Sequence, residues 1–364
     1  MSNELLDKYD TFRRDKRLLP VKCSSFYENK ILEEEAQLGH KDGPLNRIIY
    51  PSQEKIDLKP AHEVDDFVED RKNMPDQEHM DFIHKYSNRI LYMPQSHCFA
   101  HCMYCFRQDI LEEKKGSSNS DMPNKYHRTN SITRLIHYIQ SHPEITELIL
   151  SGGDPLMLPA AELDHIFQMI SEQTHIKDFR LHTRALVFSP RSFSDKHIGV
   201  LSHYQVRLVH HIVHPYELCS VNKQVIDQLN HHGIRSYNHF PLLRKINDHT
   251  EVLIRLLSDL DDLHIRNLSI YFPDPVHYSS AYRISFRRLF ELVNEFNKTT
   301  PSWINATRFC QDTIHGKVRI EDLVHYTPEQ GYALFNRQGV PIKVPDHPLE
   351  WDEPGELSTI LWKG

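Results

Sequence analysis

The stretch HCFAHCMYCFRQ at residues 97–108 carries three closely spaced cysteines, Cys98, Cys102 and Cys105. The chain has only 6 cysteines, and the remaining ones are isolated, so no second pair completes a four-thiolate zinc site. Thiolates are the usual ligands of iron–sulfur clusters. Because a cubane cluster commonly takes four thiolates, three of them leave one iron open to bind a small molecule and to pass it an electron.

A second motif follows in LILSGGDPL, where Ser151, Gly152, Gly153 and Asp154 stand at the end of an apolar run. Glycines allow the polar groups of the backbone to approach a ligand closely. Glycine-rich turns are common, so the motif gains weight only from its position one strand after the cysteines.

Short apolar runs rich in β-branched and aromatic residues alternate with amphipathic stretches long enough for helices. The runs predicted as strands are residues 89–94, 146–151, 178–185, 205–213, 234–243 and 264–272. The stretches predicted as helices are residues 130–142, 161–173, 191–203, 221–232, 249–261 and 282–297. This alternation predicts an α/β fold with a parallel sheet. We expect a partial, open (β/α)6 barrel, in which the loops after the strands form the active site.

The sequence outside this alternation predicts two flanking parts. Residues 1–88 are polar and rich in charge, and we expect a mostly helical region with little strand; residues 89–300 form the barrel, and residues 301–364 form a C-terminal extension. The segment GYALFNRQGVPIKVPD predicts a hairpin with its turn at NRQG. The polar stretch at residues 112–128 is predicted as a loop.

Composition narrows the class of protein. The net charge of -7 argues against nucleic acid as a partner. The N-terminus lacks the apolar segment of a signal peptide, and no apolar run approaches the roughly 20 residues that span a bilayer. We therefore expect a cytoplasmic protein without a membrane partner, in which clustered cysteines serve a metal or catalysis rather than disulfides.

Several blocks occur together and in a family order: SNRILYMPQSHCFAHCMYCFRQ, LSGGDPLM, RLHTRALVFSPR, LVHHIVHPYEL, NHFPLLRKIND and SIYFPDP. Over about residues 80–345 the chain resembles the radical S-adenosylmethionine (SAM) superfamily, and within it the lysine 2,3-aminomutase family, including the branch that makes β-lysine on a translation elongation factor. The resemblance implies a [4Fe–4S] cluster that cleaves SAM to a 5′-deoxyadenosyl radical. It also implies pyridoxal 5′-phosphate (PLP), on which an amine migrates from C2 to C3 of an amino acid.

The resemblance carries roles over to individual residues. Cys98, Cys102 and Cys105 would bind the cluster, and Ser151, Gly152, Gly153, Asp154, His211 and His239 would bind SAM, with Asp154 meeting its ammonium. Arg89 would contact the PLP phosphate and Lys317 would be the PLP lysine. Arg107 would meet the substrate carboxylate, and Asp274 with Tyr271 would line the cavity for its side chain.

Three departures from the family keep alternatives open. The glycine run before the PLP lysine has shrunk to Gly316, the second ammonium-binding acid falls near Cys310, with Asp312 as a replacement after a local shift, and a family glutamine is His239 here. The substrate is therefore lysine or another amino acid. The alternative function is a PLP-independent radical SAM reaction on the same scaffold. The expected partners are the amino acid substrate, a reductant such as flavodoxin or ferredoxin, and a second copy of the chain in a homo-oligomer.

Overall fold

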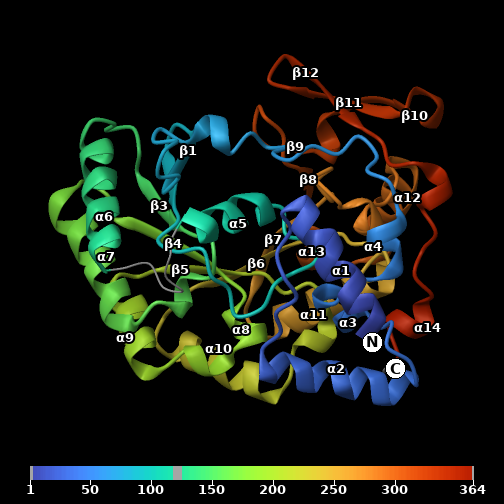
Figure 1. Cartoon of the computed structure of the whole chain (residues 1–364), viewed down its shortest axis with the longest axis horizontal. Coiled ribbons are helices and arrows are strands. Elements are labelled where there is room, and N and C mark those ends of the chain that lie inside the picture. Colours follow the sequence, from blue (N-terminus) through green and yellow to red (C-terminus); the bar gives the residue numbers. More distant parts are fainter. Residues whose placement is uncertain (1–2, 118–124, 363–364) are drawn as a thin grey trace.

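The computed structural model describes residues 3–117 and 125–362, and one nine-stranded sheet lies at its centre (Figure 1). The strands follow one another across this sheet in chain order. Seven of them pair in parallel: β2 (Arg89–Tyr92), β3 (Glu147–Leu150), β4 (Asp178–Thr183), β5 (Arg207–His210), β6 (Ser236–Pro241), β7 (Arg266–Tyr271) and β8 (Arg308–Gln311). The parallel α/β fold is confirmed, and all six predicted strands are present.

Each end of the parallel array carries one antiparallel strand. β1 (Phe82–Tyr86) pairs with β2, and β9 (Val318–Arg319) pairs with β8. Within the described ranges β1 and β9 do not pair with each other, so the sheet is open rather than a closed barrel.

Two strands, β1 and β8, lie outside the six that the sequence predicted. The β/α alternation does not stop at residue 300, because β8 adds a seventh parallel strand, and the N-terminal part contains β1. Both strands are short, and their backbone groups are satisfied by a neighbouring strand that is already in the sheet. Strand formation of this kind depends on tertiary context more than on the local pattern.

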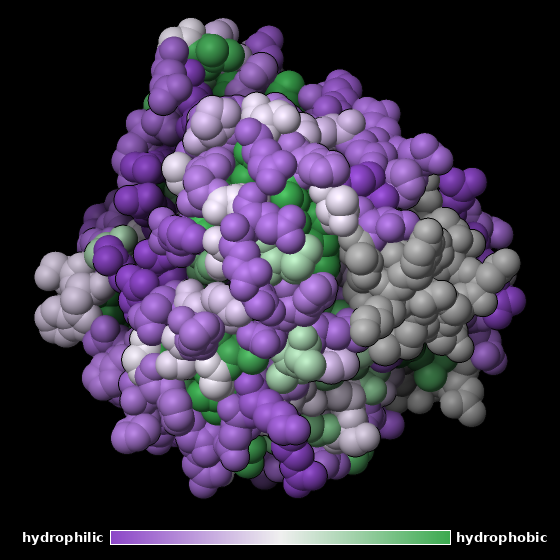
Figure 2. Space-filling view, turned by 90° about the vertical axis from the view of Figure 1, so that its left-hand side faces the viewer, coloured by the Kyte–Doolittle hydropathy of each residue, from purple (hydrophilic) through white to green (hydrophobic). Residues whose placement is uncertain are grey.

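Helices connect the parallel strands and cover the sheet: α6 (Lys125–Gln140), α7 (Ala160–Gln173), α8 (Ala185–Phe188), α9 (Asp195–His203), α10 (Ser220–His231), α11 (Thr250–Asp262), α12 (Phe286–Thr299) and α13 (Ser302–Asn305). In α11 the apolar residues recur at helical spacing and are buried: Val252, Leu253, Leu256, Leu257 and Leu260. In Figure 1 α6, α7 and α9 lie on one side of the strands. Figure 2 shows that the outer face on this side is largely hydrophilic, with scattered hydrophobic residues.

The N-terminal part supplies α1 (Asn3–Lys16), α2 (Ser25–Leu38), α3 (Pro44–Ile49) and α4 (Gln53–Asp57), in agreement with the predicted helical character. α2 begins where the Ser24 side chain accepts a hydrogen bond from the Tyr27 backbone nitrogen. It ends at Gly39, whose φ of 73° is left-handed and favours glycine. One hydrophobic core includes residues of this part, of the parallel sheet and of the C-terminal part. The domain boundaries at residues 88 and 300 stay a prediction.

The C-terminal part forms a separate three-stranded antiparallel sheet of β10 (Leu323–Thr327), β11 (Tyr332–Arg337) and β12 (Val340–Pro345), followed by α14 (Leu357–Ile360). β11 and β12 are the predicted hairpin with its turn at NRQG.

The loop predicted at residues 112–128 is wrong at both ends. α5 (Gln108–Ser117) and α6 extend into it, because helical backbone pairing continues past the point where the apolar periodicity fades. Residues 118–124 lie outside the described residues. None of the helices described is long and apolar enough to cross a membrane.

Candidate active site

The two motifs meet where β2 and β3 end. The backbone nitrogen of Gly153 donates to the Gln95 carbonyl at 3.1 Å, and that of Asp154 donates to the His97 carbonyl at 2.7 Å. A Cβ on Gly153 would lie 2.2 Å from the His97 carbonyl oxygen, so only glycine allows this approach. The loop that carries the cysteines therefore packs directly on the SGGD turn.

None of the three clustered cysteines forms a disulfide. Burial raises the pKa of Cys102, although the neighbouring Arg184 opposes the shift, and burial raises the pKa of Cys105 to about 12. In the described part of the chain, no three cysteine, histidine or acidic side chains are already arranged as a metal site. Three thiols on one loop beside a guanidinium still fit an iron–sulfur cluster by the chemistry of the donor set.

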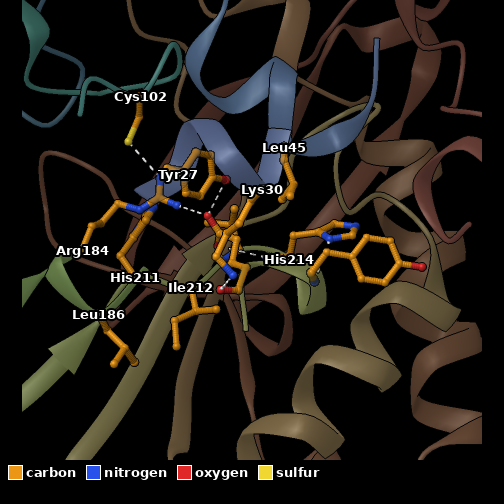
Figure 3. A network of polar contacts seen from close by, with 12 residues as sticks. Tyr27, Lys30, Leu45, Cys102, Arg184, Leu186, His211, Ile212 and His214 are labelled. Atoms are coloured by element: carbon orange, nitrogen blue, oxygen red, sulfur yellow. Dashed lines mark hydrogen bonds and ion pairs between the residues drawn. The ribbon is translucent and has the colours of Figure 1, made fainter. Parts of the chain in front are cut away.

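That guanidinium is Arg184, which directly follows β4. Its Nη1 donates to Sγ of Cys102 at 2.9 Å (Figure 3). The same Nη1 donates to the Tyr104 hydroxyl at 2.7 Å, and Nη2 pairs with Glu217. Glu217 is fully buried and also accepts from the Tyr27 hydroxyl at 2.8 Å. Burial lowers the pKa of Arg184, but Cys102 and Glu217 raise it by more, so the cation is held. Sequence reasoning missed Arg184, although a cation at a strand end in HTRAL was a usable signal.

Asp154 uses its carboxylate inside the protein. The carboxylate accepts from the Thr183 hydroxyl at 2.8 Å and from the backbone nitrogens of Arg184, at 2.9 Å, and Leu156, at 3.1 Å. Burial raises its pKa to about 6. Asp154 thus ties the end of β3 to the end of β4, and its role toward the ammonium of SAM stays a prediction. Gly152 has a φ of 96°, which lets the turn expose its backbone beside Ser151.

Three imidazoles follow one another across the sheet. The ring centroid of His239, on β6, lies 5.0 Å from that of His182, on β4, and 5.9 Å from that of His211, which follows β5. Burial lowers the pKa of all three, to about 3 for His239, so they are neutral near pH 7. His211 Nε2 lies 3.3 Å from the Tyr104 hydroxyl. Sequence reasoning missed His182. Because side chains alternate between the two faces of a strand, the segment DFRLHT could have placed His182 on the same face of the sheet as the other two imidazoles.

Lys317 precedes β9 and reaches toward β7. Its Nζ donates to the Tyr271 hydroxyl and lies 3.6 Å from Oδ2 of Asp312. Burial lowers the pKa of Lys317, but Asp312 and then Tyr271 raise it above its usual range. The ring of Tyr271 lies 5.4 Å from that of His239, which connects Lys317 to the row of imidazoles. Gly316 has a φ of 95°, which turns the chain before the lysine.

Asp274 follows β7 and accepts a hydrogen bond from Nε2 of Gln311 at 2.6 Å. Burial and the charge of Asp312 raise its pKa well above the usual range, whereas Lys317 opposes that shift. The structure therefore groups Tyr271, Asp274 and Lys317 with Asp312, which the sequence offered as the second acid, and adds Gln311.

Two arginines lie near the edges of this group. Nε of Arg107 donates to Asp70 at 2.9 Å and its Nη1 lies 3.4 Å from the Ser151 hydroxyl. The guanidinium of Arg89 stacks 3.9 Å from the ring centroid of Tyr86. The Tyr86 hydroxyl is buried without a hydrogen-bond partner among the described residues, and Lys317 and Arg89 both lower its pKa, which burial raises. A lysine, an arginine and a hydroxyl that lacks a partner fit a phosphorylated aldehyde such as PLP.

Comparisons with known proteins identify an iron–sulfur domain and related enzymes. Residues 89–206 match the family described as 4Fe-4S single cluster domain. The L-lysine 2,3-aminomutase of Escherichia coli K12 is 30% identical over 250 residues, which cover 68% of each chain. The enzyme of the same name from Buchnera aphidicola is 31% identical over 63% of this chain and 65% of that one.

A third relative extends the match. The L-lysine 2,3-aminomutase of Fusobacterium nucleatum is 28% identical over 82% of this chain and 68% of its own length. Among solved structures, a radical SAM methyltransferase from Sphaerobacter thermophilus overlays with a TM-score of 0.44 at 14% identity, over 65% of this chain and 72% of that one. The overlay is too loose to support an argument about this site.

Proposed function

Because the chain belongs to the lysine 2,3-aminomutase family of radical SAM enzymes, we propose that it is a PLP-dependent aminomutase that converts an α-amino acid to a β-amino acid. When bound, the cluster and SAM supply a 5′-deoxyadenosyl radical, and PLP carries the migrating amine. The reaction is an isomerisation: the amine moves from C2 to C3, and the hydrogen removed from C3 is replaced at C2.

The residues of this chain divide the work by position. Cys98, Cys102 and Cys105 would hold the cluster, the turn at residues 151–154 with His211 and His239 would hold SAM, and Lys317 with Arg89 would hold PLP. Arg107 would orient the substrate carboxylate, because a planar two-pronged donor matches two oxygens. The neutral imidazoles can accept or donate hydrogen bonds without adding charge beside a sulfonium.

The observation that carries the proposal is the position of Lys317. Its amine contacts the Tyr271 hydroxyl at the end of β7, on the same edge of the sheet as the cysteine loop after β2. The charges of Lys317 and Arg89 both act on the Tyr86 hydroxyl. A lysine held among these groups supports PLP-dependent chemistry over the PLP-independent alternative.

The acids around Lys317 support a substrate with a second amine. Asp312 lies 3.6 Å from the lysine nitrogen, and its charge raises the pKa of Asp274. A cation on the substrate would offset the repulsion between these two acids. Lysine is such a substrate, and its neutral analogue norleucine lacks the cation.

The test compares wild-type protein with Lys317→Ala, both reconstituted anaerobically and incubated with PLP. We expect the visible absorbance of lysine-bound PLP only in the wild type, and a β-amino acid product from lysine, identified by mass spectrometry and NMR. Lys343→Ala is the matched control, because Lys343 also lies over a tyrosine ring, that of Tyr332 at 4.7 Å, but on the separate C-terminal sheet. An identical PLP spectrum in Lys317→Ala would refute the assignment.

Failure to bind stoichiometric PLP would favour the alternative function. The observation that supports the PLP-independent alternative is that a single glycine, Gly316, precedes Lys317. In that case the reduced protein would still cleave SAM to 5′-deoxyadenosine, without forming a β-amino acid.

A further inference from the structure

Three cations from outside the cysteine motif reach the loop that carries it. Nζ of Lys22 donates to the Cys98 carbonyl oxygen at 2.6 Å. Nη1 of Arg184 donates to the Cys102 sulfur at 2.9 Å. Lys55 reaches the turn between the second and the third cysteine. Each of these three positions on the loop therefore has one cation beside it. Lys22 and Lys55 come from the N-terminal part.

Lys55 is the most unusual of the three. Its side chain is 2% exposed, and its Nζ donates to the carbonyl oxygens of Met103 and Tyr278, each at 2.9 Å. It also lies 5.4 Å from the ring centroid of Tyr282. No ion pair among the described residues joins Lys55 directly to a carboxylate, but the charge of Glu63 acts on its ammonium. Burial lowers its pKa to about 8, although Glu63 opposes the shift, so it remains mostly charged at neutral pH. A buried ammonium of this kind normally needs an anion.

Lys22 lies on a segment that runs along the cysteine loop. Its own carbonyl oxygen accepts from the His101 backbone nitrogen at 2.9 Å, and the Pro20 carbonyl lies 2.7 Å from Nδ1 of His101. Both the backbone and the side chain of Lys22 therefore form hydrogen bonds with the cysteine loop. Lys22 is half-buried, and its ammonium points at the backbone of Cys98 rather than into solvent.

Glu217 already compensates Arg184 and Glu63 acts on Lys55, and the cluster would be a further anion beside all three cations. Three thiolates outweigh the positive charge of a cubane core, and a reduced cluster is more negative than an oxidised one. Charges and hydrogen bonds near the sulfurs are among the factors that set the reduction potential. Positive charge beside the loop lowers the free energy of the reduced cluster more than that of the oxidised cluster.

We propose that Lys22, Lys55 and Arg184 form a cation cradle that compensates the negative charge of the cluster and raises its reduction potential. The inference rests on the cluster of the proposed function, but not on PLP or on the substrate. The three residues act on the cluster through their charge and are not catalytic. The cradle gives the N-terminal helical part a function that its sequence does not reveal.

The test measures the cluster rather than turnover. Wild type, Lys55→Met, Lys22→Met, Lys22→Arg and Lys85→Met are reconstituted anaerobically with iron and sulfide, and iron is counted per chain. The midpoint potential is then followed by electron paramagnetic resonance during titration with dithionite. Lys85→Met is the matched control, because Lys85 also donates to two backbone carbonyls, those of Val68 and Thr313, but from β1.

We expect more negative midpoint potentials in Lys55→Met and Lys22→Met, a near-normal value in Lys22→Arg, and no change in Lys85→Met. Loss of iron from Lys55→Met, with a native circular dichroism spectrum and with iron retained in Lys85→Met, would also support the cradle. If Lys55→Met does not fold, Lys22→Met decides the matter. A fully loaded Lys22→Met with an unmoved potential, or an equal shift in Lys85→Met, overturns the inference. A wild-type chain that binds no cluster overturns the proposed function instead.

Discussion

At the scale of single residues, the site is dominated by side chains whose charge is controlled by a neighbour. Arg184 is held as a cation by Cys102 and Glu217, whereas burial keeps His182 and His239 neutral. Lys317 is the residue for which this control matters most. It must lose a proton before it can bond to the aldehyde of PLP, and its acidic neighbour opposes that loss.

The first prediction concerns that acidic neighbour. Asp312→Asn removes the largest cause that raises the pKa of Lys317, so the lysine loses its proton more readily. The pH at which PLP binding is half complete should fall by about one pH unit or more. Visible absorbance of PLP against pH measures it. Asp322→Asn, at an acid that accepts from the exposed backbone nitrogen of Arg319, is the control. A midpoint that rises or stays constant in Asp312→Asn contradicts the account.

At the scale of elements, the site depends on how two strand-end loops fit together. The turn after β3 packs on the loop after β2 through two backbone hydrogen bonds, which start at Gly153 and Asp154, and Ser151 donates a third to the end of β2. The packing is tight enough that no side chain fits at Gly153. The position of the cysteine loop is therefore set partly by the strand that follows it.

A second prediction tests this fit. Gly153→Ala places a Cβ against the backbone of His97 and Ser96, and because the three nearest atoms are all backbone, the loops must move apart. Overpacking of this kind costs roughly 1–3 kcal/mol of unfolding free energy. Anaerobic urea unfolding of the apoprotein and iron content per chain measure both effects.

The control for this variant is Gly199→Ala in α9, where a new Cβ would have no atom within 4 Å. Alanine favours the helix, so this change should stabilise by about 0.5–1 kcal/mol. Equal behaviour of the two variants would show that the contact between the loops is not tight.

At the scale of the whole molecule, the N-terminal part is bound to the barrel by charge as well as by the shared core. Glu54, on α4, pairs with Arg244 at 3.0 Å and with Lys245 at 2.7 Å, both after β6, and with Arg47 at 3.4 Å. Arg244 is 2% exposed, so it has no water to replace a lost partner. The same helix carries Lys55, so this set of ion pairs also fixes one cation of the cradle.

The third prediction follows from this arrangement. Glu54→Gln leaves a buried guanidinium without its carboxylate and should lower the free energy of unfolding by roughly 3 kcal/mol at pH 7. Burial raises the pKa of Glu54, but Lys245 and Arg244 lower it by more, to a net decrease. A depressed acid stabilises the fold above its unfolded pKa, and that stability is lost as pH falls through the folded value. The difference in unfolding free energy between the wild type and Glu54→Gln should therefore disappear below about pH 4.

Urea unfolding of the apoprotein at several pH values measures it. Glu4→Gln is the control, because its pair with Lys8 lies on the surface of α1 with both side chains more than half exposed, and no measurable change is expected there. A loss in Glu54→Gln that persists at acid pH would contradict the electrostatic explanation.

The periodicity of the sequence was sufficient to predict six of the helices of the barrel and six of its strands, because buried strands and amphipathic helices repeat their apolar residues locally. It did not predict α5, α8 or α13. Nor did it predict β1 and β8, whose hydrogen bonds depend on strands distant in the chain. The cysteine loop, the SGGD turn, Tyr271, Asp274 and Lys317 could be picked out as candidates, because unusual residue types at strand ends are visible in one dimension. Their roles in binding stay predictions.

What the sequence by itself determined was the inventory: three thiols on one loop, a glycine turn one strand later, and the α/β order that brings strand ends to one edge. Only the tertiary structure decided which side chains are neighbours in space. The fold brings Arg184 beside Cys102, 82 positions away in the chain. It also brings Lys22 and Lys55 from the N-terminal part against the cysteine loop, and it turns Asp312 toward Lys317. Charge and burial act through space, so the protonation of each group depends on neighbours that local pattern cannot identify.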